Sequence, residues 1–399
     1  MNKIPKDWEV KKLVEICEIM DNQRKPINSS EREKRLISAK QKFPYYGATG
    51  QVGFIDDYIF DCEAVLLGED GAPFLDFFKD KAYMVSGKFW VNNHAHILKA
   101  KNKISLNAFI CYFLNTLDYS PYVSGTTRLK LNQSSMKNIE IPLPPLSEQK
   151  AIVDKLDDSF AKIENAITNL INAKENLKLY KQSVLKSAFN GDLLPNTSPT
   201  HWEVKKLGEI CEKIGDGLHG TPSYNDDGEY FFINGRNISY PYLIINNNVK
   251  RLSSDEALKY KKDFNTHTIF VSINGTLGNI GFYNNEKIIL GKSVCYLNLK
   301  DNVNKYYIFF NLKSNEFLNY ANLKATGSTI KNVSLQAMRN FEIPLPPLSE
   351  QNLIVAEIDR RFAIVDKTLN LIDKSIQNAK NLKQSILKKA FSGELRSEI

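Results

Sequence analysis

Two long stretches of the chain place apolar residues at alternating spacings of three and four, a pattern typical of coiled-coil helices. They extend over residues 147–189 and 349–392. A 3.5-residue period kept over about five heptads predicts helices roughly 60 Å long, each with one apolar stripe that must be buried. The stripe residues expected are Leu156, Phe160, Ile163, Ile167 and Leu170 in the first helix, and Ile358, Phe362, Val365, Leu369 and Ile372 in the second.

Both predicted helices carry start and stop signals. Prolines hold the chain extended before each helix, and Ser147 or Ser349 is expected to cap the first turn. Gly191 and Gly393 follow the last periodic residues and are expected to end the helices.

Neither helix can bury its stripe alone, and the simplest partner for each is the other. A pseudo-twofold relation makes the pair antiparallel, which predicts an intramolecular coiled coil. In the alternative, each helix packs on its own globular domain as an ordinary core helix. Lys174, Lys181 and Lys383 interrupt the stripes, and the first two are expected to specify the register with their charged ends turned outward.

The helices belong to a longer internal repeat. Three segments recur: PLPPLSEQ at 142–149 and 344–351, the helix ends at 187–193 and 389–395, and WEVKKL at 8–13 and 202–207. The first two recur after 202 residues and the third after 194, so the second copy has about eight additional residues between these landmarks. A period near 200 residues is too long for a solenoid repeat, and it predicts two similar domains.

The regions before the two helices are expected to be α+β. Short β-rich runs broken by Gly, Asn and Asp occur in both, and a helical patch follows in each, at 107–116 and 305–321. The expected strands are 64–67, 89–91 and 96–98 in the first region, and 230–233, 268–273 and 294–299 in the second. The predicted boundaries are 1–143 and 201–345 for the two domains, 144–192 and 346–395 for the helices, and 193–200 for a linker.

The composition, with 42% hydrophobic and 25% charged residues, is that of an ordinary soluble globular protein. No apolar run approaches the ~18 residues that a membrane helix requires, and the N-terminus has no signal-peptide core. The five cysteines are scattered and odd in number, which argues against a disulfide framework and favours the reducing cytoplasm. The net charge of +8 permits nucleic-acid binding without requiring it.

Recognisable catalytic motifs are missing from the sequence. It has no P-loop, no dinucleotide-binding GxGxxG after a strand, no GxSxG, and no Asn-Pro-Pro-aromatic stretch of the kind that amino-methyltransferases use. Cys62, His94 and His96 could ligate a metal, but alternate positions of a strand produce the same histidine spacing without one. No catalytic residue and no metal are therefore expected.

Polar and basic residues gather in glycine-rich loops, where the backbone can approach a ligand. Ser, Thr and amide groups suit phosphates, and Arg, Asn and Lys suit base edges. A Ser/Thr-Gly-Thr/Ser-Thr pattern stands before each helix and is expected to contact phosphate; the alternative is a set of solvated turns. The candidate DNA-binding residues are Tyr46, Thr49, Thr126, Thr127, Arg128 and Lys130 in the first region, and His219, Thr221, Arg236, Asn237, Asn274, Thr276, Ser328, Thr329 and Lys331 in the second.

PLPPLSEQ, the long helix after it and the Ala-Phe-x-Gly-Asp/Glu-Leu ending resemble the DNA-specificity subunits of type I restriction-modification systems, and the resemblance covers both halves. WEVKKL and the loops at 46–50, 217–222 and 275–278 also look like the target-recognition domains of that family. The resemblance implies an α+β fold in which two α/β target-recognition domains are separated by two long antiparallel helices, an intramolecular coiled coil with a pseudo-twofold repeat. The second domain departs from its counterpart in being longer.

The resemblance further implies a non-catalytic subunit that binds double-stranded DNA. Each domain would read one half of a bipartite, asymmetric site, while the helices would set the spacer and dock modification subunits, usually two. Catalysis would lie on those chains, which transfer a methyl group from S-adenosylmethionine to adenine N6. A restriction subunit, where present, would use ATP with Mg²⁺, and no cofactor is expected on this chain.

Two alternative functions lead to different experimental results. In an orphan or fused methyltransferase or nuclease system, the purified chain itself would bind S-adenosylmethionine or nick DNA with Mg²⁺. A coiled-coil scaffold whose end domains bind protein would not confer salt-dependent DNA binding on an assembled methyltransferase, because that dependence comes from counterions released by the phosphates.

Overall fold

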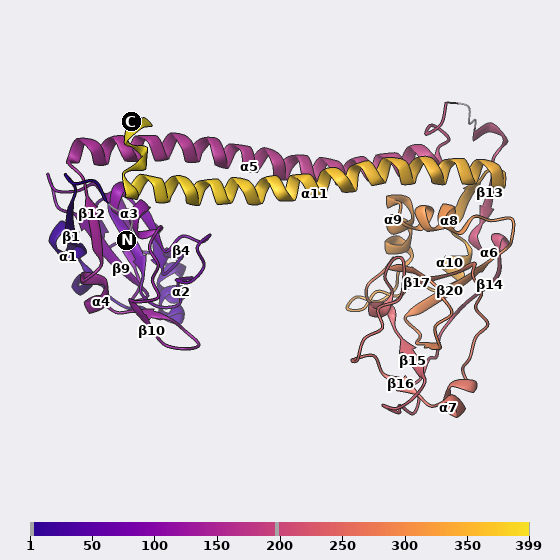
Figure 1. The fold of residues 1–399 in the computed structure, drawn as a ribbon. Coiled ribbons are helices and arrows are strands. Elements are labelled where there is room, and N and C mark those ends of the chain that lie inside the picture. The colour runs from indigo at the N-terminus through magenta and orange to yellow at the C-terminus, as the bar shows by residue number, and fades with distance from the viewer. Residues whose placement is uncertain (1–3, 196–198, 399) are drawn as a thin grey trace. The chain divides into compact units, whose positions relative to one another are not determined.

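The computed structural model describes residues 4–195 and 199–398 (Figure 1). Contacts between residues divide the chain into two compact units: unit 1 comprises Met1–Asn172 with Ile372–Ile399, and unit 2 comprises Ala173–Leu371. Each unit contains one globular region and parts of both long helices.

The two long helices are α5, Leu146–Phe189, and α11, Leu348–Ser392. Both stop signals are confirmed, because Gly191 and Gly393 each adopt a φ of +80° just after the helix. This left-handed conformation is the one that favours glycine at a helix C-terminus.

The predicted serine caps are wrong. Helix α5 begins one residue before Ser147, and the carbonyl of Pro145 accepts hydrogen bonds from the amides of Glu148 and Gln149, each at 2.9 Å. The serine therefore lies inside the first turn. The extended backbone that proline favours already supplies the geometry of the residue that precedes a helix.

Within unit 1 the segments of α5 and α11 run antiparallel. Glu148 of α5 accepts a hydrogen bond from Arg396, just beyond α11, at 2.6 Å. Further along α5, Glu164 accepts one from Lys383 at 3.0 Å, so the chain advances on one helix as it goes back on the other. The Lys383 ammonium also lies 4.8 Å from the centre of the Phe160 ring.

We call this group of a lysine, an acid and an aromatic ring the lysine cluster. It recurs in unit 2, where each position is offset by 202 residues. Lys181 donates to Asp366 at 2.5 Å and lies 4.7 Å from the centre of the Phe362 ring. An exposed ion pair contributes only about 0–1 kcal/mol to stability. The lysine, however, meets an acid and an aromatic ring at the same time, and this arrangement requires one alignment of the two helices. This agrees with a role for the seam lysine in specifying the register.

The residues expected in the apolar stripes are withdrawn from solvent. Leu156, Phe160, Ile163, Ile358, Val365 and Ile372 are buried, and Ile167, Leu170, Phe362 and Leu369 are half-buried. The helix ends also enter the cores of the globular regions, where Phe391 of α11 lies 5.2 Å from Phe109 and 5.4 Å from Phe113, between ring centres. Each helix therefore packs both on the other helix and on a globular region.

The globular region of unit 1 contains two four-stranded sheets. Its strands are β1 (Glu9–Lys12), β2 (Cys17–Ile19), β3 (Phe43–Gly47), β4 (Gly50–Ile55), β5 (Phe60–Asp61), β6 (Ala64–Gly68), β7 (Ala82–Val85), β8 (Lys88–Val91), β9 (Ala95–Ala100), β10 (Val123–Ser124), β11 (Lys130–Leu131) and β12 (Glu140–Leu143). Its helices are α1 (Leu13–Ile16), α2 (Ser29–Ile37), α3 (Asn107–Leu114), α4 (Gln133–Lys137) and the 3₁₀ turn η1 (Asp21–Gln23). The sheet orders are β2-β9-β6-β7 and β4-β3-β8-β5, with separate pairs β1-β12 and β10-β11.

The globular region of unit 2 repeats this plan. Its strands are β13 (Glu203–Lys206), β14 (Cys211–Asp216), β15 (Tyr230–Ile233), β16 (Arg251–Leu252), β17 (Thr268–Ser272), β18 (Ile280–Phe282), β19 (Ile288–Leu290), β20 (Val294–Leu299) and β21 (Glu342–Leu345). Its helices are α6 (Leu207–Ile210), α7 (Ser254–Leu258), α8 (Lys305–Leu312), α9 (Asn315–Lys324) and α10 (Leu335–Arg339), with 3₁₀ turns η2 (Pro199–His201) and η3 (Gly235–Asn237); a further turn, η4 (Glu394–Glu398), follows α11. The orders β14-β20-β17-β18, β16-β15-β19 and β13-β21 match those of unit 1 with two differences among the described residues. The second sheet has one edge strand fewer, and a single bridge, Thr326–Asn332, takes the place of the β10-β11 pair.

The six strands predicted from the sequence are confirmed, as β6, β8, β9, β15, β17 and β20. The predicted helical patch at 305–321 is two helices, α8 and α9. The break falls at Ser314, whose hydroxyl accepts from the amide of Phe317 at 3.3 Å and so starts a new helix.

A buried glutamine joins each long helix to its globular region. Gln149, the last residue of the first PLPPLSEQ, accepts from the Ser105 hydroxyl and the Leu106 amide and donates to the carbonyls of Ile104 and Pro144, at 3.0–3.2 Å. Gln351, its counterpart, accepts from the Asn304 amide and donates to the Pro346 carbonyl, each at 2.8 Å. The glutamine of PLPPLSEQ therefore recurs for a structural reason, because both side chains bond to backbone groups near the start of a long helix.

In unit 1, α3 and the β1–β12 pair lie beside the long helices, and β10 lies at the opposite end of the globular region (Figure 1). The hairpin of β10 and β11 thus stands away from the helices. Across residues 4–195 and 199–398, no helix has the length and apolar character needed to cross a membrane.

Candidate nucleic-acid interface

The Ser/Thr-Gly-Thr/Ser-Thr segments form the same tight loop in both units. These Gly-Thr loops comprise residues 124–131 in unit 1 and 326–333 in unit 2. Gly125 has φ +103°, and a Cβ on it would lie 2.5 Å from the Arg128 carbonyl oxygen. Gly327 has φ +91°, and a Cβ there would lie 2.4 Å from the Ile330 oxygen. Glycine is therefore required at both positions, by conformation and by space.

Each Gly-Thr loop is held by a turn that follows a central strand of the first sheet. We call these turns the support turns; they comprise residues 69–71 after β6 and residues 273–275 after β17. In unit 1 the Gly71 amide donates to the Leu129 carbonyl at 3.1 Å, and the Leu131 amide donates to Glu69 at 2.8 Å. The support turn of unit 2 makes the same two bonds: Gly275 to Lys331 at 2.9 Å and Val333 to Ile273 at 2.8 Å. The two units thus share one backbone frame at this place.

The side chains on this shared frame differ between the units. In unit 1 the Arg128 guanidinium lies 2.6 Å from the Asp70 carboxylate. In unit 2 the position of Asp70 is taken by Asn274, whose amide donates to Asn332 at 3.1 Å. One backbone frame therefore carries a charged pair in one unit and a neutral amide pair in the other.

In unit 1 the frame borders a cleft of about 790 Å³. Four chain segments line it: the turn after β3, the support turn with the loop that follows it, the loop after β8, and the Gly-Thr loop. Of the candidate residues, Thr49, Thr127 and Arg128 line the cleft. Tyr46 instead packs against Tyr83 and Phe89, with ring centres 5.9 and 6.0 Å away, and serves the core.

Tyr83 positions the turn that carries Thr49. Its hydroxyl donates to the Gly47 carbonyl at 2.5 Å and to the Gly50 carbonyl at 3.4 Å. Burial raises the pKa of this phenol, so it stays protonated and able to donate.

Acidic residues lie beneath the basic residues of the cleft. Asp70 holds Arg128 and also lies 3.5 Å from His94, and Glu69 lies 3.4 Å from the Lys130 ammonium. Arg128 and Lys130 remain more than half exposed, so each is oriented by an acid while its outer face stays accessible.

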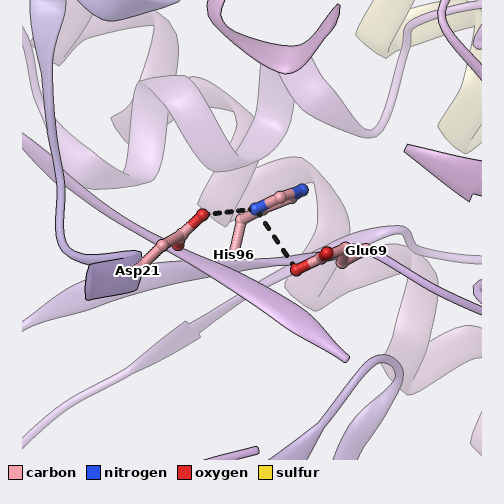
Figure 2. A group of neighbouring side chains, drawn as sticks. All are labelled: Asp21, Glu69 and His96. Carbon is pink, nitrogen blue, oxygen red and sulfur yellow. Dashed lines mark hydrogen bonds and ion pairs between the residues drawn. The ribbon is translucent and has the colours of Figure 1, made fainter. Parts of the chain in front are cut away.

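A buried ion network supports the base of this frame (Figure 2). His96 Nδ1 lies 2.6 Å from Asp21 and 3.7 Å from Glu69, and Nε2 lies 2.8 Å from the Leu131 carbonyl. Both ring nitrogens therefore face acceptor atoms. The Arg24 guanidinium also belongs to the network and lies 2.6 Å from Glu69.

Hydrogen bonds within the network stabilise the charged form of Asp21. Burial by itself raises the pKa of Asp21, but hydrogen bonds from His96, Gln133 and the Ile97 amide outweigh it and lower the pKa below its ordinary value. The ligand atoms of Asp21, Glu69 and His96 lie within 4.8 Å of one another, close enough to hold a metal ion. Because the Arg24 guanidinium already pairs with both carboxylates, we interpret the group as a structural network. It differs from the Cys62, His94 and His96 set considered from the sequence.

In unit 2, three of the candidate loops meet. A Cβ on Gly235 would lie 3.2 Å from Ser272 Cβ and 3.6 Å from the Asn274 carbonyl oxygen, which places turn η3 against the support turn. Asn274 in turn bonds Asn332 at the base of the Gly-Thr loop. Arg236, the central residue of η3, is exposed and makes no ion pair or hydrogen bond with any described residue. It is therefore a cation available to a ligand.

Other candidates in unit 2 have structural partners. Asn237 is buried and donates to the Ile244 carbonyl at 3.3 Å, so it shapes η3 and is not available to DNA. Lys331 donates to Asn322 at 2.7 Å, and His219 lies 2.6 Å from Asp216. The remaining candidates, Thr221, Thr276, Ser328 and Thr329, are exposed, as are Thr126 and Thr127 of unit 1.

Sequence reasoning missed several residues of the interface. His94, considered only as a metal ligand, lines the cleft of unit 1, together with Asn92 and Leu75. Glu69 and Asp70, in the turn after β6, were not among the candidate residues. Asp21 and His96 are 75 residues apart, and no local signal joins them, because the contact exists only once β9 is placed in its sheet.

We expect Arg236 to contribute more to DNA binding than an exposed lysine that is already paired. Replacing Arg236 with alanine should weaken binding of specific DNA by about 1–3 kcal/mol if it reads guanine. The matched control is Lys287→Ala, since Lys287 is exposed but paired with Glu229 at 2.6 Å. Filter binding or fluorescence anisotropy measures both. Equal DNA affinities for the two variants would mean that Arg236 is a solvated turn residue with no role in binding.

These features define a class of protein in which one backbone frame occurs twice in the chain, carries a different set of side chains in each unit, and is followed each time by a long helix. A family model described as the type I restriction modification DNA specificity domain matches residues 5–173 and again 199–379. The chain belongs to this family of type I restriction-modification DNA specificity subunits.

Individual relatives agree with this assignment. The chain is 29% identical to the type I restriction enzyme EcoKI specificity subunit of Escherichia coli K12, over 74% of this chain and 67% of that protein. It is 23% identical to the EcoDI specificity subunit of Escherichia coli, over 99% and 90%. Two solved structures share the fold, each at 20% identity over 98% of both chains. One comes from work on the assembly of a type I R-M system, with a TM-score of 0.70, and the other is the HsdS subunit from Thermoanaerobacter tengcongensis, with a TM-score of 0.58.

Proposed function

We propose that the globular region of each unit reads one half of a bipartite, asymmetric DNA site through its Gly-Thr loop, its support turn and their neighbours. The observation that carries the proposal is the pair of equivalent hydrogen bonds that builds one backbone frame under two different side-chain sets. The hydroxyls of Thr126, Thr127, Ser328 and Thr329 are exposed and suit phosphate oxygens. Arg128 and Arg236 suit base edges.

The paired helices are proposed to set the length of the nonspecific spacer between the half-sites. Helix α5 has 44 residues and α11 has 45, and each passes from one unit to the other. A regular helix rises 1.5 Å per residue, so its length is fixed by its residue count. The repeated lysine clusters support a single register of the pair.

Two modification subunits are proposed to dock on surfaces that the chain presents twice. Each unit has a groove between its globular region and its helices, about 360 Å³ in unit 1 and about 610 Å³ in unit 2. Four lining positions carry the same residue types: Asp157, Phe160, Lys383 and Leu387 in unit 1, and Asp359, Phe362, Lys181 and Leu185 in unit 2. Two copies of one partner need the same surface twice, and these grooves fit that requirement.

Catalysis is proposed to lie on the partner chains. The modification subunits would bind S-adenosylmethionine and methylate adenine, and a restriction subunit, where one assembles, would use ATP with Mg²⁺.

Exchange of one globular region tests the division of labour. Residues 201–341 would be replaced with the corresponding region of another specificity subunit, and the modified adenines of the host genome mapped by single-molecule sequencing. We expect one half-site to change while the other half-site and the spacer stay the same. The reciprocal exchange of residues 8–139 is the matched control and should change only the other half-site. If either exchange changes both halves, the two regions do not read DNA independently.

A further inference from the structure

The loop between β6 and β7 of unit 1 exposes three large apolar side chains. Leu75, Phe77 and Phe78 are 55%, 51% and 53% exposed. We name residues 73–79 the apolar loop. A compact group of apolar side chains left in water is more often an interaction site than an accident of the surface.

The apolar loop is held in one conformation by its own turn. The Asp76 amide donates to the Pro73 carbonyl at 3.0 Å, and the Lys79 amide donates to the Asp76 carbonyl at 3.2 Å. The Asp76 carboxylate also accepts from the Phe78 amide at 3.0 Å. These bonds fix the backbone before any ligand binds, which lowers the entropy lost on binding.

Two buried residues anchor the apolar loop from below. Phe74 is 2% exposed and packs on Tyr119, with ring centres 5.2 Å apart. Lys81 is 1% exposed, and its ammonium donates to the Asp76 carbonyl at 2.7 Å. Burial lowers the pKa of Lys81, which reflects the cost of placing an ammonium there. Holding the loop through the buried Lys81 ammonium therefore costs the protein some stability.

The place of the apolar loop points to DNA as its ligand. Phe74 and Leu75 line the same cleft as Thr49, Thr127 and Arg128, so the first part of the loop shares a surface with the proposed DNA contacts. Phe77 and Phe78 follow in the same turn, outside the lining of the cleft. The loop is also confined to one unit. Its counterpart between β17 and β18, residues 273–279, is much shorter than the 69–81 connection of unit 1. A partner that binds in two equal copies would need the loop in both units, whereas a DNA contact need serve only one half-site.

We propose that Leu75, Phe77 and Phe78 form an apolar wedge that inserts against the bases of the half-site read by unit 1 and unstacks one base step. This rests on the proposed function, in that unit 1 must read DNA. Phenylalanine and leucine are side chains that enter between base steps, where contact with base faces compensates the lost stacking. The wedge would select a deformable step, such as a pyrimidine–purine step, without a hydrogen bond to it.

The test uses the specificity subunit assembled with its modification subunits and a duplex that carries the mapped site. The variants are Phe77→Ala/Phe78→Ala and Leu75→Ala, with Ile37→Ala as control, since Ile37 of α2 in the same unit is 86% exposed. We expect the double variant to bind specific DNA at least tenfold more weakly, and 2-aminopurine in the half-site of unit 1 to lose its fluorescence increase on binding. The dependence of affinity on salt should stay unchanged, because an apolar contact releases no phosphate counterions.

Three results would overturn the wedge. One is affinity and 2-aminopurine fluorescence equal to those of the Ile37→Ala complex. Another is weakened assembly with the modification subunits but normal DNA binding once assembled, which would make the loop a protein contact. The third is a fluorescence increase that persists in the double variant. Exchange of the region 8–139 separates these from failure of the proposed function: if that exchange leaves both half-sites unchanged, unit 1 does not read DNA at all.

Discussion

Replacing Gln149 with leucine is expected to destabilise unit 1 by about 2–5 kcal/mol, because leucine keeps the volume but leaves buried polar groups without partners. Gln149 is completely buried and makes four hydrogen bonds, one to each of Ser105, Leu106, Ile104 and Pro144. An unsatisfied buried group costs about 1–3 kcal/mol, and part of this set can turn to water after the substitution. Since a domain is stable by only about 5–15 kcal/mol, the loss would be visible at once.

Urea unfolding of the full chain, followed by circular dichroism and by tryptophan fluorescence, measures this loss. Gln351→Leu is the paired variant in unit 2 and should cost less, because two hydrogen bonds are lost in place of four. Gln377→Leu makes the same substitution at an exposed position of α11 and should change stability by less than about 0.5 kcal/mol. If Gln149→Leu unfolds at the same urea concentration as Gln377→Leu, the buried amide does not hold the helix to its globular region.

Insertion of seven residues into both long helices, after Asn172 and after Leu371, is expected to lengthen the spacer of the recognised site and leave both half-sites unchanged. Seven residues preserve the heptad register, so the apolar stripes continue to face each other. They add about 10 Å of helix, which corresponds to roughly three base pairs. Methylation of the original site should fall by about 100-fold or more, because one half-site no longer meets its globular region.

Methylation mapping of the genome measures the new spacer directly. The control inserts four residues into both helices, which shifts the stripes out of the heptad pattern and should reduce assembly instead of changing the site. An unchanged spacer in a folded, active seven-residue variant would contradict the role of the helices as a ruler.

The helices and the repeat are the part of this protein that the sequence describes well. The stripes of α5 and α11 consist of residues a few positions apart, and helix periodicity is a local property. The strands β6, β8, β9, β15, β17 and β20 were recognisable for the same reason, since each is a short apolar run between breakers. The serine caps were mispredicted because Pro145 and Ser147 both suit a helix start, and only the hydrogen bonds decide between them.

The candidate site was only partly predictable. The sequence by itself determined that Gly125 and Gly327 recur before equivalent helices, and that polar residues surround them. Only the tertiary structure decided that Tyr46 and Asn237 face inward while Arg236 is exposed. The orientation of a side chain in a loop depends on segments far away in the chain.

The sequence determined the architecture of this protein: one α+β plan written twice, with a long amphipathic helix after each copy. The tertiary structure decided what each copy presents. It joined Gly71 to Leu129 and Gly275 to Lys331, placed Asp70 under Arg128, and buried His96 between Asp21 and Glu69. The physical reason is range: periodicity and turn preference act over a few residues, whereas these contacts join strands and loops that only the packed sheets bring together.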